Sequence, residues 1–100
     1  MNWEATHIEI DKVKAGEKHI MLFKAAGKVP EDFKIDKLEV SCGCTTPEFD
    51  KEQGTLLVTF KAGAVPRHLQ EEGKYITTKR VILSSNYGDT TFTFRATIVK

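Results

Sequence analysis

The sequence predicts an all-β fold, an immunoglobulin-like β-sandwich of about seven antiparallel strands, and three observations support this. Two segments alternate strictly between apolar and polar positions, turn signals recur at short intervals, and almost no segment has helical periodicity. With 100 residues, 40% of them hydrophobic and 29% charged, the chain is long enough to bury a core of its own. We therefore expect residues 1–100 to form a single immunoglobulin-like domain, with a small closed barrel as the structural alternative.

Strict alternation identifies the two clearest strands, residues 55–62 and 91–98. Successive side chains of a strand point to opposite faces of the sheet, so the apolar residues of one parity are expected to face the core. Phe23 and Phe33 are expected to join this core. The residues of the two strands predicted to point inward are Leu56, Val58, Phe60, Ala62, Phe92, Phe94, Ala96 and Ile98.

Four further runs rich in β-branched or aromatic residues predict less regular strands, at residues 3–10, 19–25, 33–42 and 75–85. In the third run the apolar parity switches between Ile35 and Leu38, as a β-bulge or a strand that changes sheets requires. That run is therefore expected to be bent or to count as two strands.

The connections carry turn signals. Residues 14–17, 50–54 and 86–89 are expected to be hairpin-type turns that join neighbouring, paired strands. In the last of these, Gly88 stands where a short hairpin loop needs a positive φ. The longest connection, residues 63–74, has Pro and Gly at the start and stop positions of one short helical turn.

Charge and motif content argue against several function classes. A net charge of +1 gives no field that would attract nucleic acid or an anionic membrane, and the apolar runs are too short to span a bilayer. There is no Gly-rich phosphate loop, nucleophile elbow or zinc-protease motif, so we expect no enzyme and no cofactor. His7, His19 and His68 are scattered singly, so no metal site is expected. The N-terminus has no leader-like segment, and the chain is expected to start as written.

One segment, residues 40–48 (VSCGCTTPE), carries a recognisable signature. It resembles the SCGCT-Pro motif of domain-of-unknown-function family fifteen-seventy-three, which is related to immunoglobulin-like Hydin and sperm-protein domains and is encoded by bacteria and phages. The strand patterns on both sides of the motif are similar too, so the resemblance covers about residues 19–99. A Glu-Gln-Gly sequence replaces the family's usual Pro-Gly after the motif, and the 63–74 connection is longer than usual. The resemblance implies an immunoglobulin-like fold.

The chemistry of Cys42-Gly43-Cys44 has three interpretations. A local disulfide would need the backbone to curl at Gly43, which glycine allows, and its small ring would add little stability. Two thiolates would supply only half of a zinc site. The favoured interpretation is a pair of small buried thiols that pack a corner between a strand and a turn, with all three residues structural.

Several other residues have a structural and a functional interpretation. Trp3 is expected to plug the end of the sandwich, and the alternative is an anchor for a partner. A mildly basic stretch is expected to be solvated, and the alternative is a phosphate site. Its members are Lys61, Arg67, His68, Lys74, Lys79 and Arg80.

The outward positions of the last strand form a candidate protein interface. They are low in charge and cheap to desolvate, and Thr77 and Thr78 are expected beside them, with Arg67 and His68 in the neighbouring 63–74 connection. The alternative is that these threonines are good β-formers facing water. The outward residues are Thr91, Thr93, Arg95 and Thr97.

Two function classes follow. The first is an accessory protein of a bacteriophage virion, a capsid-decorating or auxiliary protein that binds a capsid or tail protein. The second is a bacterial periplasmic or surface-associated binding and assembly domain. In both classes the expected partner is a protein surface, and no binding to nucleic acid or to a membrane is expected.

Overall fold

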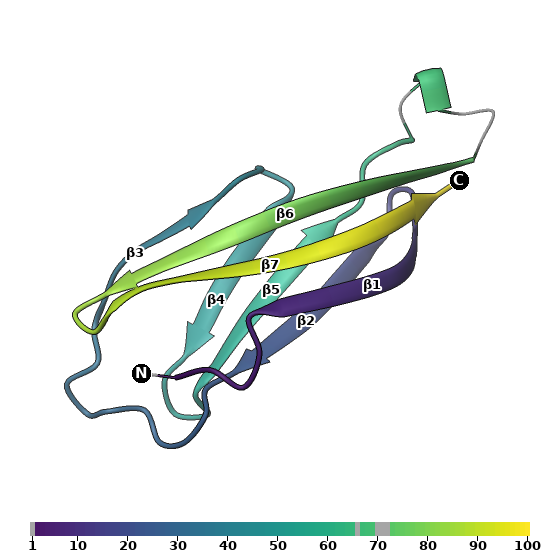
Figure 1. Cartoon of the computed structure of the whole chain (residues 1–100). Coiled ribbons are helices and arrows are strands. Elements are labelled where there is room, and N and C mark those ends of the chain that lie inside the picture. Colours follow the sequence, from purple (N-terminus) through teal and green to yellow (C-terminus); the bar gives the residue numbers. More distant parts are fainter. Residues whose placement is uncertain (1, 66, 70–72) are drawn as a thin grey trace.

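The computed structural model describes residues 2–65, 67–69 and 73–100 and shows two β-sheets packed face to face (Figure 1). Its strands are β1 (His7–Lys14), β2 (Lys18–Lys24), β3 (Ile35–Val40), β4 (Thr45–Asp50), β5 (Thr55–Lys61), β6 (Lys74–Ser85) and β7 (Gly88–Val99). One sheet has the order β1-β7-β6-β3, and the other has the order β2-β5-β4. The predicted sandwich is confirmed, and the described ranges contain seven strands, which agrees with the expected number of about seven.

The core lies between the two sheets and is built from the predicted inward residues. All the inward residues of β5 and β7 have exposed fractions between 0% and 3%. Rings from opposite sheets meet there, with the Phe23 and Phe92 centroids 4.8 Å apart and those of Phe60 and Phe94 5.2 Å apart. Trp3 is partly buried and meets Phe92 edge-on at 4.8 Å. It therefore closes one end of the core, as expected.

The two hairpins at residues 50–54 and 86–89 are confirmed. They join β4 to β5 and β6 to β7 in antiparallel pairs, and Gly88 has a φ of 107°. The parity switch after Ile35 is a β-bulge, because the register of β3 against β6 shifts between Ile35 and Lys37. The connection between β5 and β6 contains one 3-10 turn, η1 (Arg67–Leu69), which matches the short helical turn predicted there.

The expectation for residues 14–17 is wrong. The turn is tight, with the Glu17 N–H donating to the Lys14 carbonyl at 3.0 Å, but β1 and β2 belong to different sheets. Lys14 instead lies beside Val99, because β1 pairs with β7 in parallel, so the strands are not all antiparallel. A turn of this kind reverses the chain direction, but it does not determine which sheet the next strand joins. That depends on how the apolar faces pack.

β4 was not among the predicted strands. It contains Pro47, and a proline lowers the strand signal of a short run because it cannot donate a backbone hydrogen bond to the sheet. β4 is the outer strand of its sheet, where one side of the backbone needs no sheet partner. The proline is therefore accommodated at an edge.

Candidate protein interface

The predicted interface residues of β7 lie on the outer face of the four-stranded sheet. β7 is a central strand there, between β1 and β6, so it does not offer an open edge. Thr91 and Arg95 are exposed, and Thr93 and Thr97 are half-buried. The outward orientation predicted from alternation is therefore correct for all four residues.

A hydrogen-bonded network links β7 to β1 on this face. The register places His7 beside Thr93 and Glu9 beside Arg95. His7 Nδ1 lies 2.6 Å from Thr93 Oγ1, and His7 Nε2 lies 2.9 Å from Glu9 Oε1. Arg95 Nε donates to the other oxygen of the same carboxylate at 2.9 Å. These contacts fix three exposed side chains and the half-buried Thr93 relative to one another.

The network also changes the acidity of Glu9. The hydrogen bond from His7, and after it the one from Arg95, hold the pKa of the Glu9 carboxyl below its ordinary value of 4.5. Both contacts favour the charged form. His7 and Glu9 were not among the predicted interface residues, although they alternate with Ile8 and Ile10. That alternation gives their outward direction, but nothing local shows that β1 lies next to β7.

An exposed apolar side chain lies at one end of this network. Ile76 of β6 stands directly across from Thr97 and is 58% exposed. Ile76 and Thr97 line a shallow hollow in the outer face together with Glu9, Asp11 and Arg95. The face thus combines an isoleucine with ordered polar groups. Alternation does not single out Ile76, because apolar residues occur at both parities of β6.

Thr77 and the η1 residues do not join this face. Thr77 is only 6% exposed and has the parity of Val81 and Leu83, so its expected outward placement is wrong. Of the two neighbouring threonines, Thr77 is buried and Thr78 is exposed. Arg67 and His68 are exposed, but Figure 1 shows η1 beyond the end of the sandwich where β6 begins and β7 ends.

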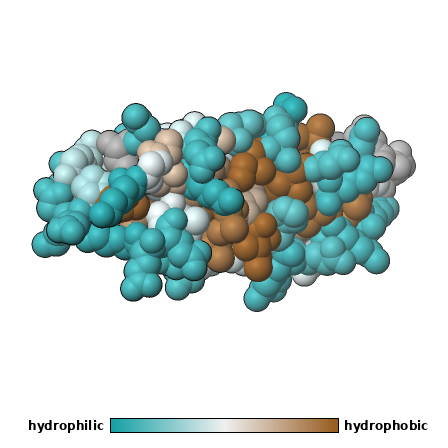
Figure 2. Space-filling model, turned by 90° about the horizontal axis from the view of Figure 1, so that it is seen from below, coloured by the Kyte–Doolittle hydropathy of each residue, from teal (hydrophilic) through white to brown (hydrophobic). Residues whose placement is uncertain are grey.

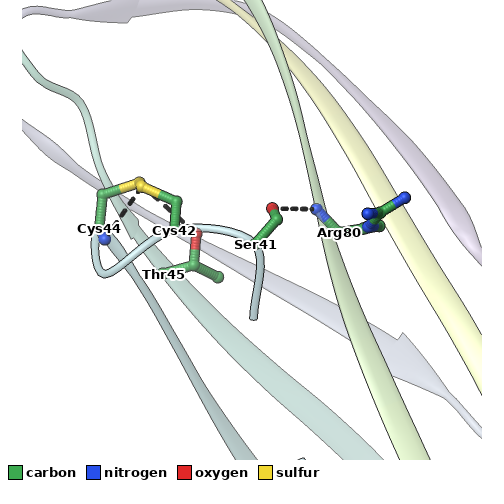
Figure 3. Close-up of a disulfide and its surroundings, with 5 residues drawn as sticks. All are labelled: Ser41, Cys42, Cys44, Thr45 and Arg80. Atoms are coloured by element: carbon green, nitrogen blue, oxygen red, sulfur yellow. Dashed lines mark hydrogen bonds between the residues drawn. A yellow bond between two sulfur atoms is a disulfide. The ribbon is translucent and has the colours of Figure 1, made fainter. Parts of the chain in front are cut away.

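The cysteine motif forms the corner that joins the two sheets. It follows β3 of one sheet and precedes β4 of the other, and the Thr45 N–H donates to the Cys42 carbonyl at 3.1 Å across the turn. The preference for free thiols is wrong, because Cys42 and Cys44 are joined by a disulfide with their Cα atoms 5.2 Å apart. The backbone curls within three residues, which brings the two sulfur atoms together (Figure 3).

Contacts around the turn attach it to both sheets. The Ser41 hydroxyl accepts a hydrogen bond from the Arg80 N–H of β6 at 3.0 Å, and the Cys44 carbonyl accepts one from the Lys61 N–H at 2.9 Å (Figure 3 shows the first). The half-buried disulfide shares a small hollow with Thr77. The cysteine motif and Thr77 are thus brought together at the corner between the two sheets, away from the outer face of the four-stranded sheet.

The described residues contain neither a cluster suited to a metal ion nor a helix suited to a membrane. In residues 2–65, 67–69 and 73–100 there is no cluster of three or more His, Cys, Asp or Glu side chains that could hold a metal ion. Nor does any helix in these ranges have the length and apolar character needed to cross a membrane.

Comparison with known proteins identifies a family and a fold. The family described as "Protein of unknown function (DUF1573)" matches residues 1–98. No curated protein sequence matches the chain. Among solved structures, the chain is similar to protocadherin gamma B7 extracellular cadherin domains 1–4, with a TM-score of 0.50 and 10% sequence identity. The match covers 98% of this chain and 24% of that one, so this chain spans about a quarter of its length. At this identity the likeness concerns the fold alone, and it supports the sandwich.

Proposed function

The chain belongs to the family described as "Protein of unknown function (DUF1573)", as residues 40–48 suggested, and from this premise we propose that it is a non-enzymatic, protein-binding module. The observation that carries the proposal is the outer face of the four-stranded sheet. There the exposed Ile76 lies at the edge of the ordered His7, Glu9 and Arg95 network. Protein interfaces combine apolar contacts with hydrogen-bonding groups in this way.

The network favours docking because its side chains are already held in place. Ordering a long side chain during association costs about 0.5 to 1.5 kcal/mol, and an arginine bonded to a carboxylate before binding has lost part of that freedom. The threonine hydroxyls of β7 add hydrogen-bonding groups that carry no charge. A partner surface can therefore cover this face without desolvating many isolated charges.

Replacing Thr93 and Thr97 with glutamate tests the docking surface. Both lie on the outer face and are half-buried, so the double variant is expected to fold. It should lose attachment to its partner, because an unpaired charge buried in an interface costs several kcal/mol. The readout is the amount of protein that co-purifies with the partner or particle.

The matched control is Thr55→Glu with Thr59→Glu, two half-buried outward positions four residues apart on β5, the central strand of the other sheet. We expect the control to attach normally. Wild-type occupancy by the β7 variant, or loss of attachment in the control alone, would contradict docking through the four-stranded sheet.

We propose further that the partner is a capsid or tail protein of a bacteriophage and that this protein is located in the virion. The resemblance to a family that phages encode and the nearly neutral charge support this. Mass spectrometry of purified particles should find the protein in a fixed ratio to the capsid protein. Its absence from particles that infect normally would overturn this assignment.

The second candidate is a binding and assembly domain of the bacterial periplasm or surface. The Cys42–Cys44 disulfide favours it, because disulfides persist in oxidising compartments such as the periplasm. Fractionation of cells that make the protein from its own gene separates the two candidates. Recovery by osmotic shock would support the periplasm, and recovery only in particles would support the virion.

A further inference from the structure

The outer edge of β2 is open along most of its length. β2 is the first strand of the β2-β5-β4 sheet. The N-terminal segment covers this edge only near Lys24, where β2 ends. There the Glu4 N–H donates to the Lys24 carbonyl at 2.9 Å, and the Ala26 N–H donates to the Asn2 carbonyl at 2.9 Å. Within the described part of the chain, no other strand pairs with this edge.

The hydrogen bonds at the ends of the β2–β5 ladder show which backbone groups are free. The Ala62 N–H donates to the Glu17 carbonyl at 2.9 Å, and the Ala25 N–H donates to the Gly54 carbonyl at 2.8 Å. Backbone groups of successive residues point to opposite sides of a strand, so the odd-numbered residues of β2 face β5. The N–H and C=O groups of Ile20 and Leu22 therefore point to the open edge.

The same two residues expose their side chains. Ile20 is 61% exposed and Leu22 is 49% exposed, and the register places Leu57 directly beside Leu22. In Figure 2 the molecule is seen from the side on which β1 and β2 lie in Figure 1, and hydrophobic residues gather in the middle of that face. Exposed apolar residues on an unpaired edge are the features used in recognition by strand addition.

Positive charges lie on both sides of the apolar residues. Lys18 and Lys24 are exposed, and alternation places them on the same face as Ile20 and Leu22. Lys61 of β5 lies directly across from Lys18. Glu17, the acidic residue next to Lys18 in the chain, precedes β2 and is exposed.

We propose that this edge binds an extended segment of another protein, which adds a strand to β2 and carries apolar residues flanked by acidic ones. Charge complementarity identifies this occupant, because Lys18 and Lys61 lie beside the apolar pair at the end of the edge that the N-terminal segment leaves uncovered. A second copy fits poorly. The antiparallel register that sets Ile20 against Leu22 of the copy also sets Lys18 against Lys24, and like charges directly opposite are destabilising.

The experiment uses two peptides with capped ends, Glu-Thr-Val-Thr-Val-Thr-Glu and the same sequence with lysine at both ends. Amide NMR spectra of the whole chain follow binding. The acidic peptide is expected to bind about tenfold more tightly at low salt, and added salt should reduce the difference. Bound peptide should slow the hydrogen exchange of the Ile20 and Leu22 amides, whereas those of Met21 and Phe23 are already protected by β5. Equal binding of both peptides would overturn the proposal.

Two variants at one position separate backbone from side-chain recognition. Leu22→Pro removes an N–H that points away from β5, so the ladder stays intact, and Pro47 is an existing example of an edge proline in β4. It should weaken binding at least about tenfold, which corresponds to losing one or more backbone hydrogen bonds. Leu22→Thr keeps the N–H and should weaken binding less. Unchanged binding by a folded Leu22→Pro variant would overturn the proposal.

Charge reversal gives a test that does not depend on proline. Lys18→Glu with Lys24→Glu should reverse the preference, so that the lysine-flanked peptide binds more tightly. The control, Lys74→Glu with Arg80→Glu on β6 of the other sheet, changes the net charge equally and should keep the acidic preference.

Self-association is the remaining outcome. A concentration-dependent dimer in sedimentation that Leu22→Pro abolishes would make a second copy the occupant and overturn the acidic segment. The Thr93 and Thr97 variant should bind the peptides normally, so failure here and failure of the proposed docking face are distinguishable.

Discussion

The Cys42–Cys44 bond closes a ring within a single turn, with only one residue between the cysteines. Cross-linking so short a loop removes little entropy from the unfolded chain, which corresponds to about 1 to 2 kcal/mol. We expect Cys42→Ser with Cys44→Ser to keep the fold and to lower the free energy of unfolding by about 1 to 3 kcal/mol, including the burial of two hydroxyls. Urea unfolding measures this. A double variant that is unfolded would show that the bond is essential.

Gly43 and Gly54 are expected to respond differently to alanine. Gly43 does not have a positive φ and has open space where a Cβ would lie, so Gly43→Ala should leave stability unchanged or raise it by up to about 1 kcal/mol. Gly54 has a φ of 65°, and its Cβ would lie 3.1 Å from Val29 Cγ2. Gly54→Ala should therefore lower stability by about 1 to 3 kcal/mol. Equal unfolding midpoints for the two variants would contradict the difference.

The lowered pKa of Glu9 predicts how the stability of the fold depends on pH. Because its pKa is lowered in the folded protein, its contribution to stability is present above the ordinary value of 4.5 and is lost as the pH falls through the folded pKa. The NMR titration of the Glu9 carboxyl should have its midpoint below 4.5, and His7→Ala should move the midpoint upward. An unchanged midpoint in that variant would show that the His7 contact does not persist in solution.

At the level of elements, β5 and β7 form the middle of the core. Phe94 is fully buried against Phe60 across the two sheets, so Phe94→Ala should lower the free energy of unfolding by about 3 to 5 kcal/mol. Thr91→Ala on the exposed face of the same strand is the control and should change it by about 0.5 kcal/mol or less. An unchanged midpoint for Phe94→Ala would be incompatible with this core.

The elements that were predicted well are those with one buried face. β5 and β7 alternate strictly, because each lies in the interior of its sheet and packs one side on the core. β4 was missed because Pro47 weakens its signal. The turn at residues 14–17 was assigned to a hairpin because its local chemistry is the same whether the next strand joins the same sheet or the opposite one.

The candidate site was predictable only in part, for the same reason. Alternation gave the outward direction of Thr93 and Arg95, but the neighbours on their face come from another strand. Thr77 was misplaced because threonine is suited to either side of a sheet and β6 carries apolar residues at both parities. The disulfide was weighed and not preferred, since spacing alone does not show whether the backbone curls between Cys42 and Cys44.

At the scale of the whole molecule, the sandwich is long for its size. Its extents are 51 × 20 × 16 Å, and its radius of gyration is 15.0 Å, compared with about 13 Å for a typical domain of this length. The cause is the hairpin of β6 and β7, in which each strand has 12 residues. Strands of that length span about 40 Å, so this hairpin sets the long axis.

The parallel pairing of β1 with β7 has a mechanical consequence. Figure 1 shows the two termini at opposite ends of the long axis, with β1 following the N-terminus and β7 leading to the C-terminus. Tension between Asn2 and Lys100 therefore pulls the two strands past each other along their length. Their hydrogen bonds, from the His7–Thr93 pair to the Lys14–Val99 pair, are loaded in shear and share the force. In the hairpin of β6 and β7, by contrast, pulling the open ends apart would break the bonds one at a time.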